Sequence, residues 1–526
     1  MFKNVFTKNY FLIFIFFFLI FGSTLVKNYG FAWDNGIHRL MGFVNLKYIV
    51  KIFNPNIEKE IPRIKNIPNY SDHPTYKLYG SLFTLPTAII ETMLGITTDN
   101  KLNDNNEKVY YLSSYIIFFI YCISLLVLNK TLVFLTNNKI ISTLSTLLLM
   151  TTPRIFAESF YNVSDIFLLC LVIFTNYFFL KYLYKSKLKN FILSSLFCSF
   201  CIITKISAGF IALTFIFTLL FVFVKNEITF RDFIKKSFIF FLIITIFYIL
   251  FFPYMWSDPF FHFIELIETM VNYGWHGNIL FFGNLIKANN TPWYYQITMF
   301  FLTIPISYLV VFLSLFIFQC FFLIKNKITM DKFFIYIFLS LILIFIASAA
   351  LQNTKYNGWR HIYFSYPYFI TVIGYMSAKI FKINFLKRFF YIFIFFLSFL
   401  IIQNLYWIIK YHPNQYAFFN SMMKNYDEKF DIDWWGMSNK EIINFLDKYD
   451  GREKIYIYSE GPSLNATLIR FNKTVKNKIE TTNNLNQANY IISNYLDYKR
   501  DYKIKFNKVY EIKTNNAIIS TIYQIN

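Results

Sequence analysis

Residues 10–26 read YFLIFIFFFLIFGSTLV, an apolar run in which no charged side chain occurs. As a helix, this run is long enough to cross the roughly 30 Å hydrocarbon core of a membrane. Lys27, Asn28 and Tyr29 follow it in place of a small-residue cleavage site, so we expect a retained first transmembrane helix. Similar runs recur at 110–128, 135–152, 164–181, 190–204, 207–224, 237–254, 293–323, 333–351, 361–379 and 389–408. The sequence therefore predicts an all-α polytopic membrane protein with about eleven transmembrane helices.

The composition and the distribution of charge agree with this fold class. Hydrophobic residues make up 56% of the 526 residues and charged residues only 15%, whereas soluble domains are about a quarter charged. Much of the net charge of +22 lies in short loops, at 181–189, 225–236, 325–332 and 379–388. Because basic loops stay in the cytoplasm, we expect a cytoplasmic N-terminus and an outward-facing C-terminal domain. The placement of Lys and Arg in these short loops is a signal of membrane topology, so we expect no nucleic-acid partner.

The expected outer side carries the long and unusual segments 27–109, 153–163, 255–292, 352–360 and 410–526, of which 27–109 and 255–292 are the two large outer loops. In the first, apolar residues from Ile37 to Tyr48 recur at helical spacing with polar residues between them, which predicts an amphipathic helix on the membrane surface. The apolar stretch 81–96 contains Pro86 and Glu91, so we expect it to be interfacial or re-entrant rather than spanning.

The C-terminal part, 410–526, is expected to be a small α/β soluble domain that follows a transmembrane domain at 1–409. A helix is predicted at 438–449, with Ser438 as its N-cap and Glu441 three residues on. Strands are predicted at 454–459, 490–494, 508–512 and 517–524, with Asn515-Asn516 as the last turn.

Asp34 lies just after the first apolar run and begins the segment Asp34-Asn35-Gly36-Ile37-His38-Arg39. One interpretation is an N-cap of the amphipathic helix, because Asp is favoured at that position. The other is a general base at the membrane surface, because a carboxylate there accepts a proton from a hydroxyl within hydrogen-bond reach. The residue alone is compatible with both.

Other charged and aromatic groups on the outer side have both structural and functional interpretations. They are Asp72-His73-Pro74 with Lys77, Arg154 and Asp165 near the start of a helix, Lys205 between two helices, Trp275-His276 in the second long loop, and Arg360-His361. Charged residues at helix ends snorkel to the interface, and aromatic residues form interfacial belts. The alternative is contact with a lipid phosphate or a sugar, for which the arginine fork is well suited.

Several short motifs follow one order along the chain. They are Asp34, His73-Pro74, Pro153-Arg154 with Asn162 and Asp165, Pro292-Trp293-Tyr294-Tyr295, Trp359-Arg360-His361 with Tyr363 and Pro367, His412-Pro413 to Asn420, and Asp433-Trp434-Trp435-Gly436. Each is weak alone, but their order and their placement on one side of the membrane resemble glycosyltransferase family 39. That family includes protein O-mannosyltransferases and the lipid A aminoarabinose transferase.

The resemblance implies a glycosyltransferase C-type fold in the bacterial inner membrane. It implies inverting transfer of a sugar from a polyprenyl-phosphate donor to a glycan, lipid or protein acceptor on the outer face. Asp34 would be the catalytic base. The departing phosphate would be stabilised by Arg360 and His361 first, then by Arg39, Lys77, Arg154 and Lys205, and His73, Asp165 and His276 complete the expected substrate contacts. Many relatives carry a second acidic residue where Asn35 stands, so no metal or other cofactor is expected.

Two other function classes compete with this one. A transporter or lipid flippase should show charged residues within its helices and often internal repeats, and few such charges and no obvious repeat are found. A polysaccharide polymerase or ligase also uses large outer loops with Arg and His, so the segment around Asp34 distinguishes it from a family-39 enzyme.

Overall fold

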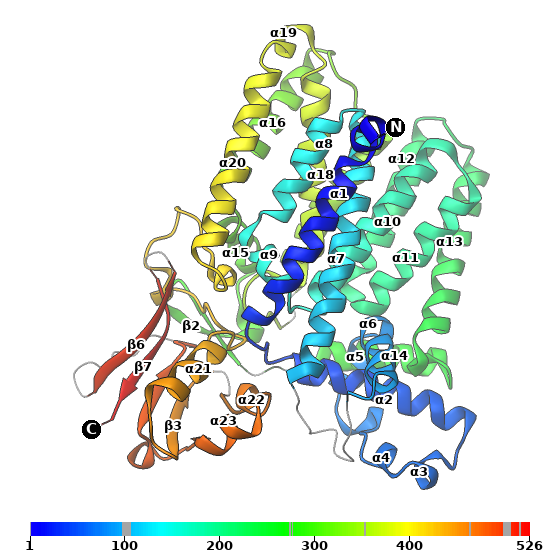
Figure 1. Cartoon of the computed structure of the whole chain (residues 1–526). Coiled ribbons are helices and arrows are strands. Elements are labelled where there is room, and N and C mark those ends of the chain that lie inside the picture. The colour runs from blue at the N-terminus through cyan, green and yellow to red at the C-terminus, as the bar shows by residue number, and fades with distance from the viewer. Residues whose placement is uncertain are drawn as a thin grey trace.

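The computed structural model describes residues 2–96, 107–272, 275, 277–351, 354–461, 464–497, 506–514 and 517–525. Long helices dominate it and run side by side in one bundle (Figure 1). The bundle contains α1 (Phe2–Leu25), α7 (Glu107–Thr136), α8 (Lys139–Met150), α10 (Asp165–Lys185), α11 (Leu188–Thr204), α12 (Gly209–Val224), α13 (Phe230–Phe251), α16 (Ile306–Ile324), α17 (Lys332–Ala350), α18 (Tyr366–Ile380) and α20 (Phe390–Lys410).

Eight helices in the described ranges are long and apolar enough to cross a membrane. The other three of the bundle, α8, α11 and α18, have 12, 17 and 15 residues and pack among the long ones. Every apolar run of the sequence therefore contains a helix of the bundle, and the predicted all-α polytopic fold class is confirmed.

The run at 293–323 forms two helices instead of the single helix expected. α15 (Tyr295–Thr303) ends before Ile304, whose backbone is extended with φ −104° and ψ 156°, and α16 begins after Pro305. The proline ring disfavours helical backbone in the residue before it, which explains the break.

Short elements cluster at the end of the bundle near α15. They are α2 (Asn35–Phe53), α3 (Ile57–Glu60), α4 (Pro62–Lys65), α5 (Thr75–Leu78), α6 (Ser81–Met93), α9 (Pro153–Glu158), α14 (Pro259–Asn272) and the hairpin of β1 (Asn278–Phe281) and β2 (Asn284–Lys287). The segment from Ile37 to Tyr48, expected to be an amphipathic helix on the membrane surface, is helical and forms part of α2. The stretch 81–96 contributes the 13-residue α6, which packs on α2 at this same end of the bundle (Figure 1).

The C-terminal part folds as a five-stranded sheet with the order β4-β3-β5-β7-β6. Its elements are α21 (Asn439–Tyr449), β3 (Ile455–Glu460), α22 (Leu464–Leu468), α23 (Lys473–Lys478), β4 (Ile479–Thr481), β5 (Tyr490–Ser493), β6 (Asn507–Thr514) and β7 (Ala517–Gln524). β3 pairs in parallel with β4 and β5, while β7 pairs antiparallel with β5 and β6. The four predicted strands are confirmed, β4 was not predicted, and the Asn515-Asn516 turn lies outside the described residues. Ser438 precedes α21 as expected, but its side chain makes no capping hydrogen bond.

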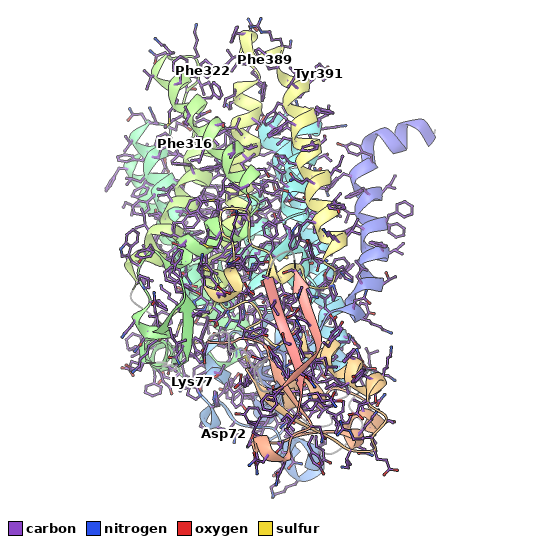
Figure 2. All side chains as sticks on the ribbon, turned by 90° about the vertical axis from the view of Figure 1, so that its left-hand side faces the viewer. Asp72, Lys77, Phe316, Phe322, Phe389 and Tyr391 are labelled. Atoms are coloured by element: carbon purple, nitrogen blue, oxygen red, sulfur yellow. The ribbon has the colours of Figure 1, made fainter. Side chains whose placement is uncertain are left out.

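The bundle has two different ends. The N-terminus and the short α19 (Asn384–Lys387) lie at one end, and α2, α14 and the sheet lie at the other (Figure 1). Figure 2 places Phe322, Phe389 and Tyr391 toward the first end and Asp72 and Lys77 toward the second. The four basic loops all lie at the first end, because each follows a helix that starts at the second end and runs to the first. They connect α10 with α11, α12 with α13, α16 with α17, and α18 with α20.

Candidate active site

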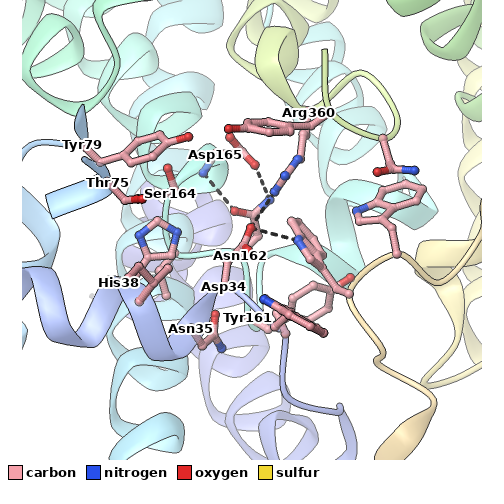
Figure 3. Close-up of a pocket in the computed structure, with 18 of the residues that line it drawn as sticks. Asp34, Asn35, His38, Thr75, Tyr79, Tyr161, Asn162, Ser164, Asp165 and Arg360 are labelled. Carbon is pink, nitrogen blue, oxygen red and sulfur yellow. Dashed lines mark hydrogen bonds and ion pairs between the residues drawn. The ribbon is translucent and has the colours of Figure 1, made fainter. Parts of the chain in front are cut away.

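A cavity of about 530 Å³ lies where the bundle meets the C-terminal domain. Its lining comes from the start of α2, the segment around α5, the segment before α10, the break after α11, the segment before the 3-10 helix η6 (Arg360–Ser365) and loops of the C-terminal domain, together with Trp275. Figure 3 shows that charged and aromatic side chains from these parts converge on it. Asp34, Asp165, Lys205 and Arg360 are its principal charged residues.

Asp34 stands immediately before α2, yet its side chain makes no capping hydrogen bond. Instead, Asp34 Oδ2 accepts hydrogen bonds from Arg360 Nη1 at 2.9 Å and from Trp435 Nε1 at 3.2 Å. The Asp34–Arg360 contact is drawn in Figure 3. Of the two interpretations that the sequence left open, side-chain capping is excluded, and the carboxylate belongs to the cavity.

The surroundings of Asp34 favour its ionised form. Burial raises the pKa of the Asp34 carboxyl, but the charges of Arg360 and His38 and the hydrogen bonds from Arg360 and Trp435 outweigh it, so the pKa lies below its usual value. At neutral pH the group is therefore a carboxylate, the form that accepts a proton from a hydroxyl.

Asp165 is the second carboxylate of the cavity and the first residue of α10. It forms an ion pair with Lys205, which lies in the break between α11 and the 3-10 helix η3 (Ile206–Ala208). Asn162 fixes its position, because the Asp165 N–H donates to Asn162 Oδ1 at 2.9 Å and Asn162 Nδ2 donates to Asp165 Oδ2 at 3.0 Å.

A third carboxylate, Glu158, lies behind Asp165 and is fully buried. It accepts hydrogen bonds from the Tyr363 hydroxyl at 2.6 Å and from Asn162 Nδ2 at 2.8 Å. Burial is the main reason that its pKa rises to about 7, and the positive charge of Arg154 opposes that rise. Glu158 does not line the cavity, so it supports the Asn162–Asp165 pair from behind.

Arg360 is placed by its charge and by two aromatic rings. Its guanidinium lies 4.6 Å from the ring centroid of Tyr356 and 5.1 Å from that of Trp435. Burial lowers the pKa of Arg360, but the charges of Asp34 and Asp165 raise it by more, so the pKa lies above its usual value. The residue is a fixed cation held between aromatic faces, as in other cation–π contacts.

A second, smaller cavity of about 120 Å³ adjoins the first. The two share Tyr79, Lys205 and Tyr356. Apolar residues of α12 and α17 line part of it, and Phe210, Ile344 and Ala347 are among them. His361 lines it too, and burial followed by the nearby charges of Lys205 and Arg360 holds its pKa well below the usual value, so its imidazole is neutral at pH 7.

The structure brings only some of the predicted site residues together. Asp34, Asp165, Lys205 and Arg360 line the large cavity, as does His73, whose Nδ1 lies 2.7 Å from the Thr75 hydroxyl. His361 lines the small one. His276 lies outside the described residues.

Three predicted cations are engaged elsewhere. Arg39 Nη2 lies 2.6 Å from Glu91 on α6, and Lys77 Nζ lies 2.5 Å from Glu265 on α14. Arg154 is fully buried, donates to the Phe418 carbonyl at 3.2 Å, and packs against Trp434, its guanidinium 5.1 Å from that ring centroid. None of the three lines either cavity.

The sequence alone assigned no site role to several residues that line the large cavity. They are His38, Tyr79, Asn162, Tyr356 and Trp435. His38 could have been found, because it lies one helical turn after Asp34 on the same face of α2. Asn162 and Trp435 already belonged to the motifs that carry the family resemblance, whereas Tyr79 and Tyr356 had no distinguishing signal, because interfacial Tyr residues are common in membrane proteins. In the part of the chain that the structure describes, no group of three or more His, Cys, Asp or Glu could hold a metal ion.

Comparisons with known proteins agree with this architecture. A family model described as dolichyl-phosphate-mannose-protein mannosyltransferase matches residues 95–256. The crystal structure of ArnT from Cupriavidus metallidurans bound to undecaprenyl phosphate covers 98% of both chains, with a TM-score of 0.50 and 8% identity. The apo structure of that ArnT covers 98% of both chains, with a TM-score of 0.51 and 7% identity. Among curated protein sequences, none matches this chain.

The identity to ArnT is low, so the likeness concerns the fold, while the family model adds a match in sequence over part of the bundle. The resemblance inferred from short motifs is thereby confirmed by independent means. In sequence over residues 95–256 and in fold over nearly its whole length, the chain is similar to the membrane-embedded proteins of glycosyltransferase family 39.

Proposed function

We propose that this protein is an inverting glycosyltransferase that moves a sugar from a polyprenyl-phosphate donor to an acceptor hydroxyl. The observation that carries the proposal is the pairing of two cavities. One cavity holds the Asp34 carboxylate beside Arg360, and it adjoins a second cavity to which α12 and α17 contribute apolar side chains, with Lys205 shared between them. A substrate with a lipid tail, a phosphate and a sugar would place its tail against the apolar side chains of the second cavity, its phosphate at Lys205 and its sugar in the first cavity.

Asp34 is the proposed base. Both of its hydrogen bonds from described residues end on Oδ2, so Oδ1 is the oxygen available to an incoming hydroxyl. Deprotonation of that hydroxyl as it attacks the anomeric carbon from the side opposite the phosphate gives inversion. The leaving group is a phosphate, whose low basicity removes the need for a second carboxylic acid to protonate it.

Lys205 and Arg360 are the proposed phosphate contacts, with His361 as a neutral hydrogen-bond donor. Lys205 lies at the junction of the two cavities, where the phosphate between a tail and a sugar would sit. Without substrate, each cation is paired with a carboxylate. Negative charge that develops on the departing phosphate is stabilised by cations already oriented around it.

The tail of the donor would follow the small cavity toward α12 and α17. Phe210, Ile344 and Ala347 offer it an apolar surface. Membrane-spanning helices on this side keep the tail in the lipid while the phosphate reaches the polar cavity. The ArnT structure that shares this fold holds undecaprenyl phosphate, which supports a donor of this class.

The reaction would take place at the outer face of a bacterial inner membrane. Basic loops lie at the end of the bundle opposite the cavity, and this asymmetry supports a cytoplasmic N-terminus and an outward C-terminal domain. A hexose or a pentose is the proposed sugar, and a glycan, a lipid or a protein is the proposed acceptor.

Transfer in vitro tests the proposal. Purified protein in detergent is mixed with polyprenyl phosphates that carry radiolabelled hexoses or pentoses, and with envelope lipid, glycan and protein fractions. We expect labelled product with the inverted anomeric configuration and release of polyprenyl phosphate. Failure of every donor to yield product or to release polyprenyl phosphate would contradict the proposal and favour a transporter.

A further inference from the structure

Resting on the proposed function, we infer that Trp435 of the C-terminal domain is a positioning residue for Asp34, and that this domain completes the active site by holding the loop that carries the base. The loop is residues 27–34, between α1 and α2. The contacts that support the inference come from three separate parts of the C-terminal domain.

The first part is a tight turn that presents Trp435. The Gly436 N–H donates to the Asp433 carbonyl at 3.1 Å, and Gly436 has φ +67°, a conformation that favours glycine. The Asp433 carboxylate accepts hydrogen bonds from the N–H and the hydroxyl of Ser438 at 3.0 and 2.6 Å, and from Asn494 Nδ2 at 3.1 Å. Because Asn494 follows strand β5, the sheet itself fixes this turn.

Trp435 reaches Asp34 in a single orientation. Its Nε1–H donates to Asp34 Oδ2 at 3.2 Å, while its ring packs edge-on against Tyr161 with centroids 5.7 Å apart. The Trp33 N–H donates to the Trp435 carbonyl at 3.2 Å, so backbone and side chain both bind the loop. Only 7% of Trp435 is exposed, and such a packed side chain has little rotational freedom.

Lys440 and Arg470 hold the backbone of the same loop. Lys440 Nζ donates to the carbonyls of Lys27 and Tyr29, the latter at 3.2 Å. Arg470 Nη1 donates to the Ala32 carbonyl at 3.0 Å, and its guanidinium lies 4.2 Å from the ring centroid of Tyr110 on α7. Two cations thus bind three carbonyls of the loop just before Asp34.

Gly30 allows the loop and the domain to approach this closely. A Cβ atom at Gly30 would lie 2.1 Å from the Met437 carbonyl oxygen, a distance that no side chain tolerates. The two backbones therefore pack directly against each other, and the domain cannot move away without releasing the loop.

The indole N–H acts on Asp34 in two ways. It fixes the carboxylate so that Oδ1 remains the oxygen for the acceptor, and it stabilises the charged form, which lowers the pKa. The ionisable groups around Asp34 are Arg360 from η6, His38 from α2, Tyr79 after α5, Arg470 after α22, and the Asp165–Lys205 pair across the cavity.

Replacing Trp435 by Phe tests the pairing, because the ring stays and the donor is lost. We expect the acid limb of the kcat/KM profile, measured from pH 3 to 8, to move up by about 0.5–1 pH unit, since the free carboxylate loses one hydrogen bond. Trp256→Phe is the matched control, because the Trp256 indole donates to Ile249 and Leu250 carbonyls instead. An acid limb that stays in place in Trp435→Phe would overturn the inference.

Hydrogen exchange tests the clamp independently of activity. In Arg470→Met, we expect amides of peptides within 27–36 to exchange at least several-fold faster than in wild type. Arg452→Met is the control, because Arg452 pairs with Asp450 within the C-terminal domain. Unchanged exchange in Arg470→Met would contradict the clamp. If wild type transfers no sugar from any donor, the proposed function fails, and the exchange result alone decides whether the domain holds this loop.

Discussion

At the scale of single residues, the cavity is organised by two ion pairs whose members differ in burial. The side chain of Asp165 is 2% exposed and that of Lys205 11%, whereas that of Asp34 is 34% exposed. A buried pair recovers its desolvation cost only while both partners are present. Asp165 is therefore structurally dependent on Lys205, while Asp34 remains open to a substrate.

Lys205→Met leaves the Asp165 charge buried without its partner. We expect the free energy of unfolding in mild detergent to fall by about 3–5 kcal/mol, and the double variant Lys205→Met/Asp165→Asn to recover much of that loss. Lys379→Met is the control, because Lys379 and Asp331 are each 31% exposed and such pairs contribute about 1 kcal/mol or less. Equal losses for Lys205→Met and Lys379→Met would rule out this account.

Glu158 makes stability depend on pH in a defined window. Its pKa is about 7 in the folded protein against an ordinary 4.5, so the folded state binds the proton more tightly. Wild type should therefore lose stability as pH rises from about 4.5 to about 7, by about 3 kcal/mol more than Glu158→Gln. Unfolding measured across this range checks the difference. Parallel curves for the two proteins would mean that Glu158 does not titrate in this way.

The sequence predicted individual charged residues better than their pairings. Asp34, Asp165, Lys205 and Arg360 were all predicted as site residues. Asp34 and Arg360 are separated by 326 residues and Asp34 and Trp435 by 401, so only the folded chain shows that they meet. Arg39, Lys77 and Arg154 are cations like Arg360, and the sequence contained nothing to indicate that they bind elsewhere.

At the scale of elements, α2 begins directly after Asp34, the proposed base, and is held in place by α6. Arg39 on α2 and Glu91 on α6 form a bidentate pair, with Nε–Oε2 at 2.9 Å and Nη2–Oε1 at 2.6 Å. Gly42 lets the two helices approach, because a Cβ atom there would lie 2.3 Å from the Thr84 carbonyl oxygen. The start of α2, and with it Asp34, therefore depends on this helix contact.

Gly42→Ala should force α2 away from α6. We expect the free energy of unfolding to fall by about 1–3 kcal/mol, as for other overpacked sites. Gly209→Ala at the start of α12 is a matched control, because a Cβ atom there meets no heavy atom within 4 Å. That variant should be neutral or gain up to about 1 kcal/mol from helix propensity. Thermal unfolding of the two variants distinguishes the clash between α2 and α6 from the general effect of replacing Gly by Ala in a helix. A Gly42→Ala variant as stable as wild type would contradict the packing argument.

Apolar runs were sufficient to predict the helices of the bundle, because each must cover a similar membrane thickness. The break at Ile304-Pro305 was missed, since both halves of the run are apolar. Strand β4 has only three residues, too few for a period-two pattern to be recognised. Length and periodicity thus predict long elements well and short ones poorly.

At the scale of the whole molecule, the bundle presents the cavity at one end and basic loops at the other. Figure 1 shows the C-terminal domain at the cavity end, beside the start of α2. Under the proposed function, the lipid-anchored donor and its acceptor meet at the end of the bundle that holds the cavity. The sidedness proposed from the basic loops determines which compartment the acceptor comes from.

Cysteine labelling tests the sidedness. Lys448 on α21 and Lys382 before α19 are both exposed and lie at opposite ends of the molecule. In a variant without the five native cysteines, we expect Lys448→Cys to react with a membrane-impermeant thiol reagent applied to intact spheroplasts, and Lys382→Cys to react only after lysis. The reverse pattern would place the active site in the cytoplasm.

The role of Asp34 as the base is the central claim, and one kinetic comparison tests it most directly. Single-turnover transfer from a labelled polyprenyl-phosphate sugar is measured for wild type, Asp34→Asn and Asp72→Asn. Asp72 is an exposed carboxylate of the same segment, 27–109, that caps a 3-10 turn and does not line the cavity, so its variant is matched in charge and chemistry. We predict that Asp34→Asn lowers the rate by about 10²–10⁴-fold while Asp72→Asn stays close to wild type. A rate for Asp34→Asn within a few-fold of wild type would contradict the account.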